Sequence, residues 1–292
     1  MRTPAELVEK FIDAGISKAS MQISKMFILS IMAGAFIAFG ASSSSLAMHA
    51  IENPGLAKFV AGAIFPVGLM LIVFIGGELF TGDCLMIMGC QKKKYSVQKM
   101  IGRLALVLFG NLVGACVVAT LVYYSGQYDM SAGALGAFTI KVAYGKATIS
   151  FGKAVASGIL CNILVCCAVM MAMAAKDVTG KIFAIFFPIM AFVCGGFEHC
   201  VANMYYIPAG LLAVHNETYR TKAMELYGYT EAQLSALNVQ NFFVTNLLPV
   251  VIGNVIGGMV FVGLPLFYIH QMKKENSVQS GVSQTGNGKR VA

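Results

Sequence analysis

The chain has 292 residues, of which 58% are hydrophobic and only 12% are charged, and its formal net charge is +8. Its mean hydropathy of +0.74 excludes an ordinary soluble globular domain and predicts an all-α integral membrane protein. We attribute the positive charge to orientation in the membrane and attraction to lipid headgroups, and we expect no nucleic-acid partner.

The chain begins with a charged, amphipathic segment over 1–25, which we expect to lie on the cytoplasmic face. Because further apolar stretches follow it, the first of them does not read as a cleaved signal peptide. The stretches after it define a six-helix channel domain over 26–270, and the Ser- and Gly-rich tail 271–292 is predicted to be disordered. Six stretches are long enough for a helical crossing of roughly 20 residues: about 26–47, 59–90, 98–124, 150–175, 181–215 and 242–269.

Six crossings place both termini on one side of the membrane. That side also carries the loops near 91–99 and 176–181, and together these segments hold most of the 21 Lys and Arg residues. The run Lys92-Lys93-Lys94 is the strongest single signal. By the positive-inside rule we expect a multi-pass protein of the cytoplasmic (inner) membrane with both termini in the cytoplasm.

Two phrases recur in the crossings. Gly-Asn-x-x-Gly occurs at 110–114 in the third crossing and at 253–257 in the sixth. The second and fifth crossings both carry a Phe-Pro step followed by a Gly-Gly pair and an acidic residue, which is Glu78 in one and Glu198 in the other. Because three crossings per half force the second half to insert upside down, the pattern predicts an inverted 3+3 repeat.

The two repeats cover about 26–124 and 150–269. Their second helices, the second and fifth crossings, are too long for one straight helix and are interrupted by glycine pairs. We predict that both are broken near mid-membrane, where transporters with inverted repeats place the substrate path.

An adjacent carboxylate and imidazole, Glu198 and His199, lie in the middle of the fifth crossing. A charged group at that depth costs at least about 2.5 kcal/mol unless it faces protein or water. We expect His199 to face the path opposite the Thr81 hydroxyl, which lies in the matching break. Glu198 is interpreted as a brace that accepts hydrogen bonds from backbone N–H groups of the opposite broken helix, with Glu78 as its repeat-mate.

Other residues near the breaks have structural or lining roles in this interpretation. Amides in apolar helices must find hydrogen-bond partners, and four of them are expected to pin the broken segments: Asn111, Asn162, Asn203 and Asn254. Apolar side chains are expected to form collars on either side of the central polar spot, with ordinary core packing as the alternative: Phe65, Leu69, Leu79, Phe80 and Phe192.

Two other classes of protein are alternatives to a transporter. An intramembrane enzyme using Glu198 and His199, or a His/Cys metal site, would add a nucleophile or a second ligand at a spacing such as HExxH, and the sequence has neither. A water or glycerol channel would carry Asn-Pro-Ala at both half-helices, which the sequence also lacks. We therefore expect no enzyme, no metal and no cofactor.

The phrases GGELFTG at 76–82, GFEHCVANMYYIPAG at 196–210 and GNVIGG at 253–258 closely resemble those of the formate/nitrite transporter family. This family consists of bacterial and archaeal anion channels. The resemblance covers roughly residues 20–270 of this chain. It implies an aquaporin-like protomer in a homopentamer, with one pore in each protomer. Within the family the likeness is greatest to formate-type and hydrosulfide-type members.

The resemblance also implies roles for residues. His199 and Thr81 form the central site, Lys146 is the lysine that attracts anions to the vestibule, and Asn162 and Asn254 brace the two breaks. The outer constriction would comprise Phe65, Phe80 and Phe192, and the inner one Leu69 and Leu79.

The expected function is pH-dependent passage of small monovalent weak-acid anions: formate, nitrite or hydrosulfide, with a hydrosulfide-specific channel as the alternative. The anion would take up a proton as it enters the low dielectric and would pass an apolar collar as the neutral acid. His199 is the candidate proton donor or relay. By analogy with the family, segment 1–25 could act as a lid.

Overall fold

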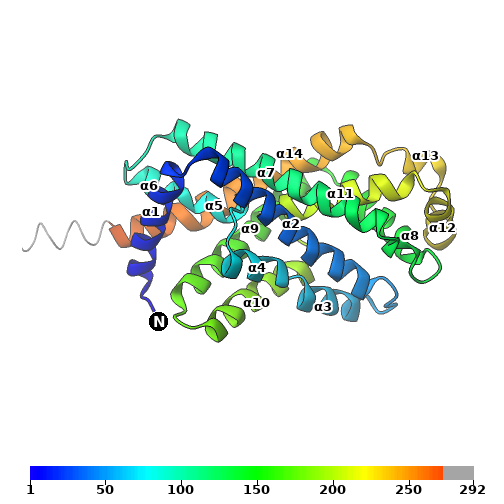
Figure 1. Ribbon diagram of the computed structural model, residues 1–292, viewed down its shortest axis with the longest axis horizontal. Coiled ribbons are helices and arrows are strands. Elements are labelled where there is room, and N and C mark those ends of the chain that lie inside the picture. The colour runs from blue at the N-terminus through cyan, green and yellow to red at the C-terminus, as the bar shows by residue number, and fades with distance from the viewer. Residues whose placement is uncertain (272–292) are drawn as a thin grey trace, which may run out of the picture.

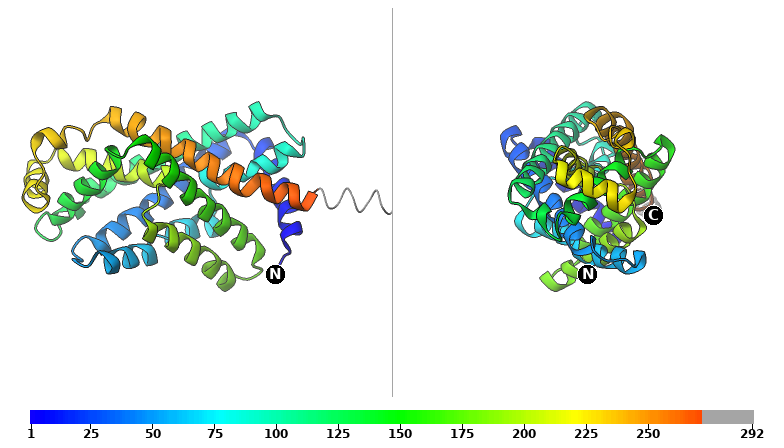
Figure 2. Two further views of the ribbon diagram at one scale, coloured as in Figure 1. Left: turned by 180° about the vertical axis from the view of Figure 1, so that it is seen from behind. Right: turned by 90° about the vertical axis from the view of Figure 1, so that its right-hand side faces the viewer.

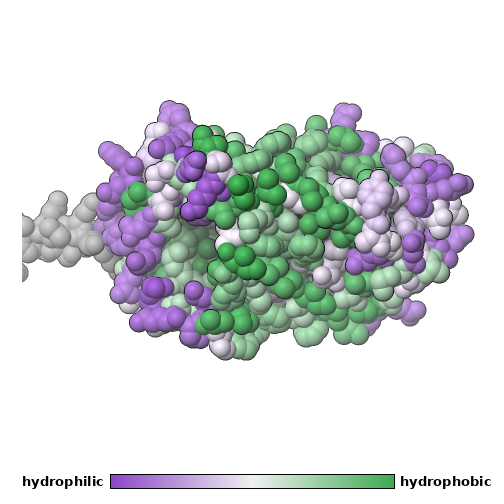
Figure 3. Space-filling view, viewed as in Figure 1, coloured by the Kyte–Doolittle hydropathy of each residue, from purple (hydrophilic) through white to green (hydrophobic). Residues whose placement is uncertain are grey.

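The computed structural model describes residues 1–271, so the tail predicted over 271–292 lies outside the described residues except for Gln271. All regular elements in this part of the chain are helical. Six of them are long and apolar enough to cross a membrane, as predicted. On the face shown in Figure 3, apolar residues occupy the middle of the elongated molecule and hydrophilic residues gather at its two ends.

The crossings begin within about five residues of the predicted stretches, and the second and fifth end at the breaks, before the predicted stretches 59–90 and 181–215 end. In chain order they are α2 (Ile23–Met48), α3 with α4 (Pro54–Ile64 and Val67–Ile75), α7 (Val97–Tyr124), α9 (Phe151–Ala174), α10 (Val178–Gly195) and the stretch Asn241–Gln271. The last of these contains α14 (Leu248–Val255) between two π-helical stretches, Asn241–Leu247 and Ile256–Gly263. Seen end-on, the crossings form one bundle (Figure 2).

Shorter helices complete the fold. They are α1 (Pro4–Ser20), α5 (Phe80–Asp83), α6 (Ile87–Gln91), α8 (Ala134–Ala147), α11 (Cys200–Val214), α12 (Glu217–Tyr227) and α13 (Glu231–Leu234), with 3₁₀ turns at Cys84–Met86 and Gln127–Asp129. At one end of the molecule α1 packs against α6 (Figure 1), and at the other end lie α8, α12 and α13.

Both predicted breaks are present, and each contains a glycine at positive φ. Helix α4 ends at Gly76, with φ of 106°, and the chain is irregular until α5 begins at Phe80. Helix α10 ends at Gly196, with φ of 67°, and α11 begins after His199. A residue with a Cβ atom rarely adopts these angles, so the Gly-Gly pairs determine where the helices stop.

The first break is fixed by an asparagine of the third crossing. Asn111 accepts a hydrogen bond from the Phe80 backbone N–H at 3.0 Å, so it satisfies a donor at the start of α5. Its amide group donates to the backbone carbonyls of Ser30 at 2.7 Å and Glu78 at 2.9 Å. One buried amide therefore joins α2, α7 and the broken segment.

The second break is fixed in the same way by the sixth crossing. Asn254 accepts from the Cys200 backbone N–H at 3.0 Å and donates to the carbonyls of Gly158 at 2.8 Å and Glu198 at 3.0 Å. Asn162 adds bonds to the carbonyls of Asn254 at 2.6 Å and Thr81 at 3.2 Å, which link the two halves. The paired asparagines, one in the third crossing and one in the sixth, confirm the inverted repeat predicted from the sequence.

The glycines of the Gly-Asn-x-x-Gly motif also allow helices to pack closely. A Cβ atom on Gly114 would lie 1.9 Å from the Ile31 carbonyl oxygen, and one on Gly257 would lie 2.4 Å from that of Ile159. Helix α7 can approach α2 closely, and the π-helical stretch Ile256–Gly263 can approach α9, only because these positions lack a side chain. Gly-Asn-x-x-Gly is thus both a helix-packing motif and an anchor for the breaks.

Substituting Asn254 by Ala is expected to destabilise the protein by about 3 kcal/mol or more, because a buried N–H and two carbonyls lose their partner. Asn111→Ala should have a similar effect, since its bonds are equivalent. The measurement is thermal unfolding in detergent, with the exposed Gln98→Ala as the control. A shift no greater than that of the control would contradict the anchoring role.

Candidate functional site

Two cavities lie on opposite sides of the breaks. The distal chamber, on the side away from the termini, has a volume of about 390 Å³ and is lined by residues that include Lys58, Lys146, Glu198 and His199. The proximal chamber, beneath α1, has a volume of about 160 Å³ and is lined by residues that include Lys18. We expect a permeating solute to pass between them.

His199 and Thr81 meet between the two breaks. The imidazole Nε2 lies 2.9 Å from the Thr81 hydroxyl oxygen, and both side chains are buried. The other ring nitrogen, Nδ1, accepts a hydrogen bond from the Ala202 backbone N–H at 3.1 Å, so His199 is the N-cap of α11. The structure thus brings together the two residues expected at the central site.

This geometry assigns the tautomer of His199. Because Nδ1 accepts from a backbone N–H, it carries no proton, and the neutral ring holds its proton on Nε2. That N–H then donates to Thr81, whose hydroxyl keeps its own proton for a further donation. The site presents hydrogen-bond donors while remaining uncharged.

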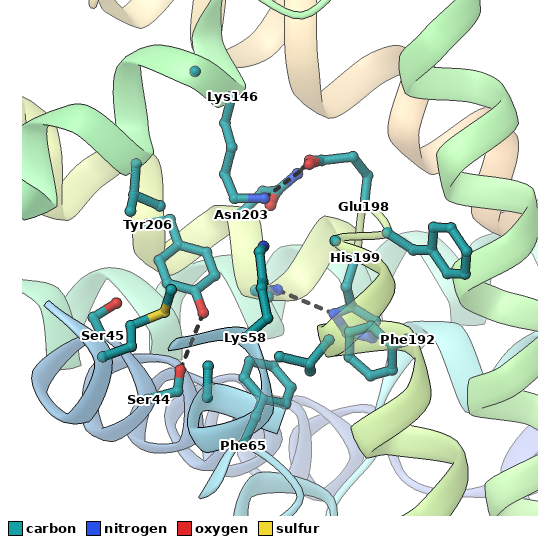
Figure 4. A pocket seen from close by; sticks show the side chains of 18 of the residues that line it. Ser44, Ser45, Lys58, Phe65, Lys146, Phe192, Glu198, His199, Asn203 and Tyr206 are labelled. Carbon is teal, nitrogen blue, oxygen red and sulfur yellow. Dashed lines mark hydrogen bonds and ion pairs between the residues drawn. The ribbon is translucent and has the colours of Figure 1, made fainter. Parts of the chain in front are cut away.

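An aromatic collar lies beside this pair in the wall of the distal chamber, which His199 also lines. The rings of Phe65 and Phe192 meet edge to face with centroids 5.4 Å apart, and Phe192 also stacks on His199 at 5.9 Å. Both phenylalanines line the distal chamber, as expected for an outer constriction. Figure 4 shows them beside the imidazole.

Phe80 is the first residue of α5 and directly precedes Thr81; both are buried, and neither is among the residues that line the two chambers. Its place in the outer constriction stays a prediction. On the other side, Leu69 and Leu79 line the proximal chamber, where the inner constriction was expected.

Glu198 pairs with a lysine. One carboxylate oxygen lies 2.9 Å from the Lys146 ammonium, and the other accepts from Asn203 at 2.6 Å and from Asn246 at 3.4 Å. The expectation that Glu198 accepts from backbone N–H groups of the opposite half is wrong, because its carboxylate is bound by these side chains and the Phe80 N–H of that half is bound by Asn111. Figure 4 shows Lys146 reaching down to Glu198 and Asn203.

Glu78, in the first repeat, also pairs with a lysine. It pairs with Lys18 of α1 at 2.5 Å, and Lys18 also contacts Asp83 at 2.5 Å. Each break therefore carries one acidic residue that is neutralised by a lysine from a helix outside the break. The repeat relation of the two glutamates is retained, with a different partner from the one expected.

Sequence reasoning missed several residues of the site. Asn246 lies in a π-helical stretch of the sixth crossing, and its only sequence signal was an amide within an apolar run. Lys58 lies at the start of an apolar crossing and lines the distal chamber. Among residues 1–271, no three His, Cys, Asp or Glu side chains are placed to share a metal ion.

The architecture and the His–Thr pair can be compared with known proteins. A family model described as formate/nitrite transporter matches residues 5–268. The chain belongs to this family. It is therefore a membrane transport protein and not an enzyme, in agreement with the sequence-based prediction.

Relatives in the formate/nitrite transporter family match along nearly their whole length. The formate channel FocA of Escherichia coli (strain K12) is 34% identical over 275 residues, which cover 94% of this chain and 96% of FocA. The uncharacterized transporter YrhG of Bacillus subtilis (strain 168) is 38% identical over 281 residues, with coverage of 94% and 96%.

A solved structure of the family agrees with the fold. It is described as a pentameric formate channel with formate bound, and it shares 34% sequence identity with this chain at a TM-score of 0.78. The match covers 85% of this chain and 98% of that one.

Proposed function

We propose that this chain forms a channel for formate in the cytoplasmic membrane and that the solute crosses the apolar collar as the neutral acid. The observation that carries the proposal is an uncharged His199–Thr81 pair beside a phenylalanine collar, at the end of a lysine-lined chamber. Relatives named as formate channels support the choice of substrate.

The distal chamber attracts anions. Three lysines line it, Lys58, Lys141 and Lys146, and they face one carboxylate, that of Glu198. A cleft with an excess of one charge and low-dielectric walls concentrates ions of the opposite sign. Small monovalent anions would therefore gather next to the collar.

Crossing the collar requires loss of charge. Phe65 and Phe192 offer no hydrogen bonds to an anion, so its desolvation would cost several kcal/mol. The same low dielectric raises the proton affinity of a carboxylate. Formate would take up a proton from water at this boundary and would then cross as formic acid at a much smaller cost.

His199 acts in this scheme as a neutral hydrogen-bond donor at mid-path. A proton relay through the ring, as suggested from the sequence, requires Nδ1 to give up the Ala202 N–H and bind a proton. The relay is thus the alternative role of the same residue, and substitutions of His199 separate the two.

The chain is proposed to assemble as a homopentamer with both termini in the cytoplasm. The pentameric description of the solved relative supports the assembly. The basic loop with Lys92, Lys93 and Lys94 lies on the side of the termini and supports the orientation. Each protomer would hold its own path, because both chambers are lined within one chain.

The test is flux into proteoliposomes with formate, nitrite, hydrosulfide, acetate and chloride. We expect formate uptake with one proton per anion and chloride flux at least about tenfold slower, because chloride gains no neutral form and each 1.4 kcal/mol of barrier is a factor of ten. Equal chloride and formate fluxes would contradict passage as the neutral acid. A strong preference for hydrosulfide over formate would favour the hydrosulfide-specific alternative.

A further inference from the structure

The proximal chamber contains a cluster with two acidic side chains and one basic side chain. The Lys18 ammonium lies 2.5 Å from Glu78 and 2.5 Å from Asp83, so two carboxylates share one lysine. The side chain of Asp83 is only 4% exposed, and its second oxygen, Oδ2, has no hydrogen-bond partner. Lys18 and Asp83 both line the chamber.

Comparison of the two repeats shows that the clusters at the two breaks differ in charge. Asn203 stands five residues after Glu198, and Asp83 stands five residues after Glu78. The distal cluster thus has one lysine, one carboxylate and a neutral amide, whereas the proximal cluster has a second carboxylate in place of the amide. The Asn203 side-chain oxygen is also unpartnered, but it is neutral and holds no proton.

The surroundings leave the extra charge uncompensated. Besides Lys18 and Glu78, the titratable groups that face Asp83 are the Tyr95 hydroxyl and the thiols of Cys84 and Cys166. None of these can supply a second positive charge. Burial disfavours the ammonium of Lys18, but the carboxylates of Asp83 and Glu78 outweigh this and raise the pKa of Lys18, so the lysine stays charged at neutral pH.

We infer that the Glu78–Asp83 pair is a proton-holding site of the proximal chamber, which receives the proton of the arriving acid and by its charge controls anion entry from the side of the termini. The inference rests on the proposed function. In the transfer, the O–H bond of formic acid breaks and a new O–H bond forms at Asp83 Oδ2. Formate leaves as the anion, and water in the chamber later removes the proton from Asp83.

The Glu78–Asp83 pair makes the two chambers differ in how they admit anions. With both carboxylates ionised, the proximal cluster carries one net negative charge and repels an entering anion. With one proton bound, the cluster is neutral and admits it. Formate should therefore enter from the side of the termini more readily as the pH on that side falls, whereas the lysine-lined distal chamber attracts anions without this control.

The experiment uses Asp83→Asn, which restores the amide found at the equivalent position of the other repeat. Formate flux from the side of the termini is measured in oriented proteoliposomes while the pH on that side is varied at constant formic acid concentration. We expect the variant to lose the pH dependence of the wild type and to be about tenfold faster at alkaline pH, equivalent to about 1.4 kcal/mol of removed repulsion. Asp83→Glu, which keeps the charge, should retain the dependence, and so should the exposed Asp13→Asn of α1.

The outcomes separate this inference from the proposed function. If the wild type takes up formate with protons but Asp83→Asn has the wild-type pH profile, the proton-holding site is wrong and the proposed function stands. If the wild type carries no formate, the proposed function fails and the inference fails with it. Should Asp83→Asn not assemble, Glu78→Gln must flatten the profile in the same way, and an unchanged profile there overturns the inference.

Discussion

Substituting His199 by Ala is expected to reduce formate flux by about 100-fold, equivalent to about 2.7 kcal/mol, because a buried hydrogen-bond donor at mid-path is lost. The variant loses the Nε2–H that meets Thr81 at 2.9 Å and also the N-cap acceptor of α11. Stopped-flow uptake of formate into proteoliposomes measures the effect. Flux near that of the wild type would show that the path does not pass this residue.

The Gln variant separates the two roles of His199. A glutamine amide can place an N–H near the position of Nε2, but it cannot carry a proton between partners. If His199 serves as a neutral donor, His199→Gln should keep flux within about tenfold of the wild type, with an unchanged pH profile. If His199 is a relay, Gln should be as inactive as Ala.

Thr81 offers a matched control for the same contact. Thr81→Ser keeps the hydroxyl that accepts from the imidazole, whereas Thr81→Val keeps the shape and removes the hydroxyl. If His199 is a neutral donor, the formate flux of Thr81→Ser should equal that of the wild type, and the flux of Thr81→Val should fall toward that of His199→Ala. Equal fluxes for Ser and Val would exclude the hydroxyl from the mechanism.

The breaks and their anchors could be predicted from the sequence because their signals are local or repeated. A Gly-Gly pair in an apolar helix determines where the helix stops, and Gly76 and Gly196 do so through their positive φ angles. The Gly-Asn-x-x-Gly phrase occurs once per repeat, so Asn111 and Asn254 could be paired before their bonds were known. His199 was indicated by the cost of an imidazole at mid-span.

The partners of the buried carboxylates could not be predicted in this way. Lys18 lies on a helix before the first crossing and meets Glu78 sixty positions later in the chain. Lys146 lies on α8, which packs along α11, and its contact with Glu198 depends on that packing. Such pairs are set by tertiary structure, so no spacing in the sequence reveals them.

Substituting Lys146 by Met is expected to affect both stability and transport. The ammonium of Lys146 compensates Glu198, whose side chain is only 8% exposed, at 2.9 Å. Removing one partner of a buried ion pair costs about 3–5 kcal/mol, because the remaining charge has no compensation. Thermal unfolding in detergent should therefore occur at a clearly lower temperature than in the wild type, and formate flux should fall about tenfold or more as the distal chamber loses a positive charge.

The double variant Lys146→Met with Glu198→Gln distinguishes these two effects. A neutral glutamine can turn its carbonyl oxygen toward the donors of Asn203 and Asn246, so it keeps the hydrogen bonds that Glu198 accepts. The unpaired charge is gone, and most of the lost stability should return. Flux should stay low if the Lys146 charge itself draws anions to the collar.

Lys153→Met is the matched control, because Lys153 is exposed on α9 and is not among the residues that line the distal chamber. It changes the net charge of the protein by the same amount, so a general electrostatic effect would appear in it as well. Recovery of flux together with stability in the double variant would mean that Lys146 serves only to neutralise Glu198. In that case Lys58 and Lys141 would have to supply the attraction, and removing either of them should reduce formate flux in the double variant.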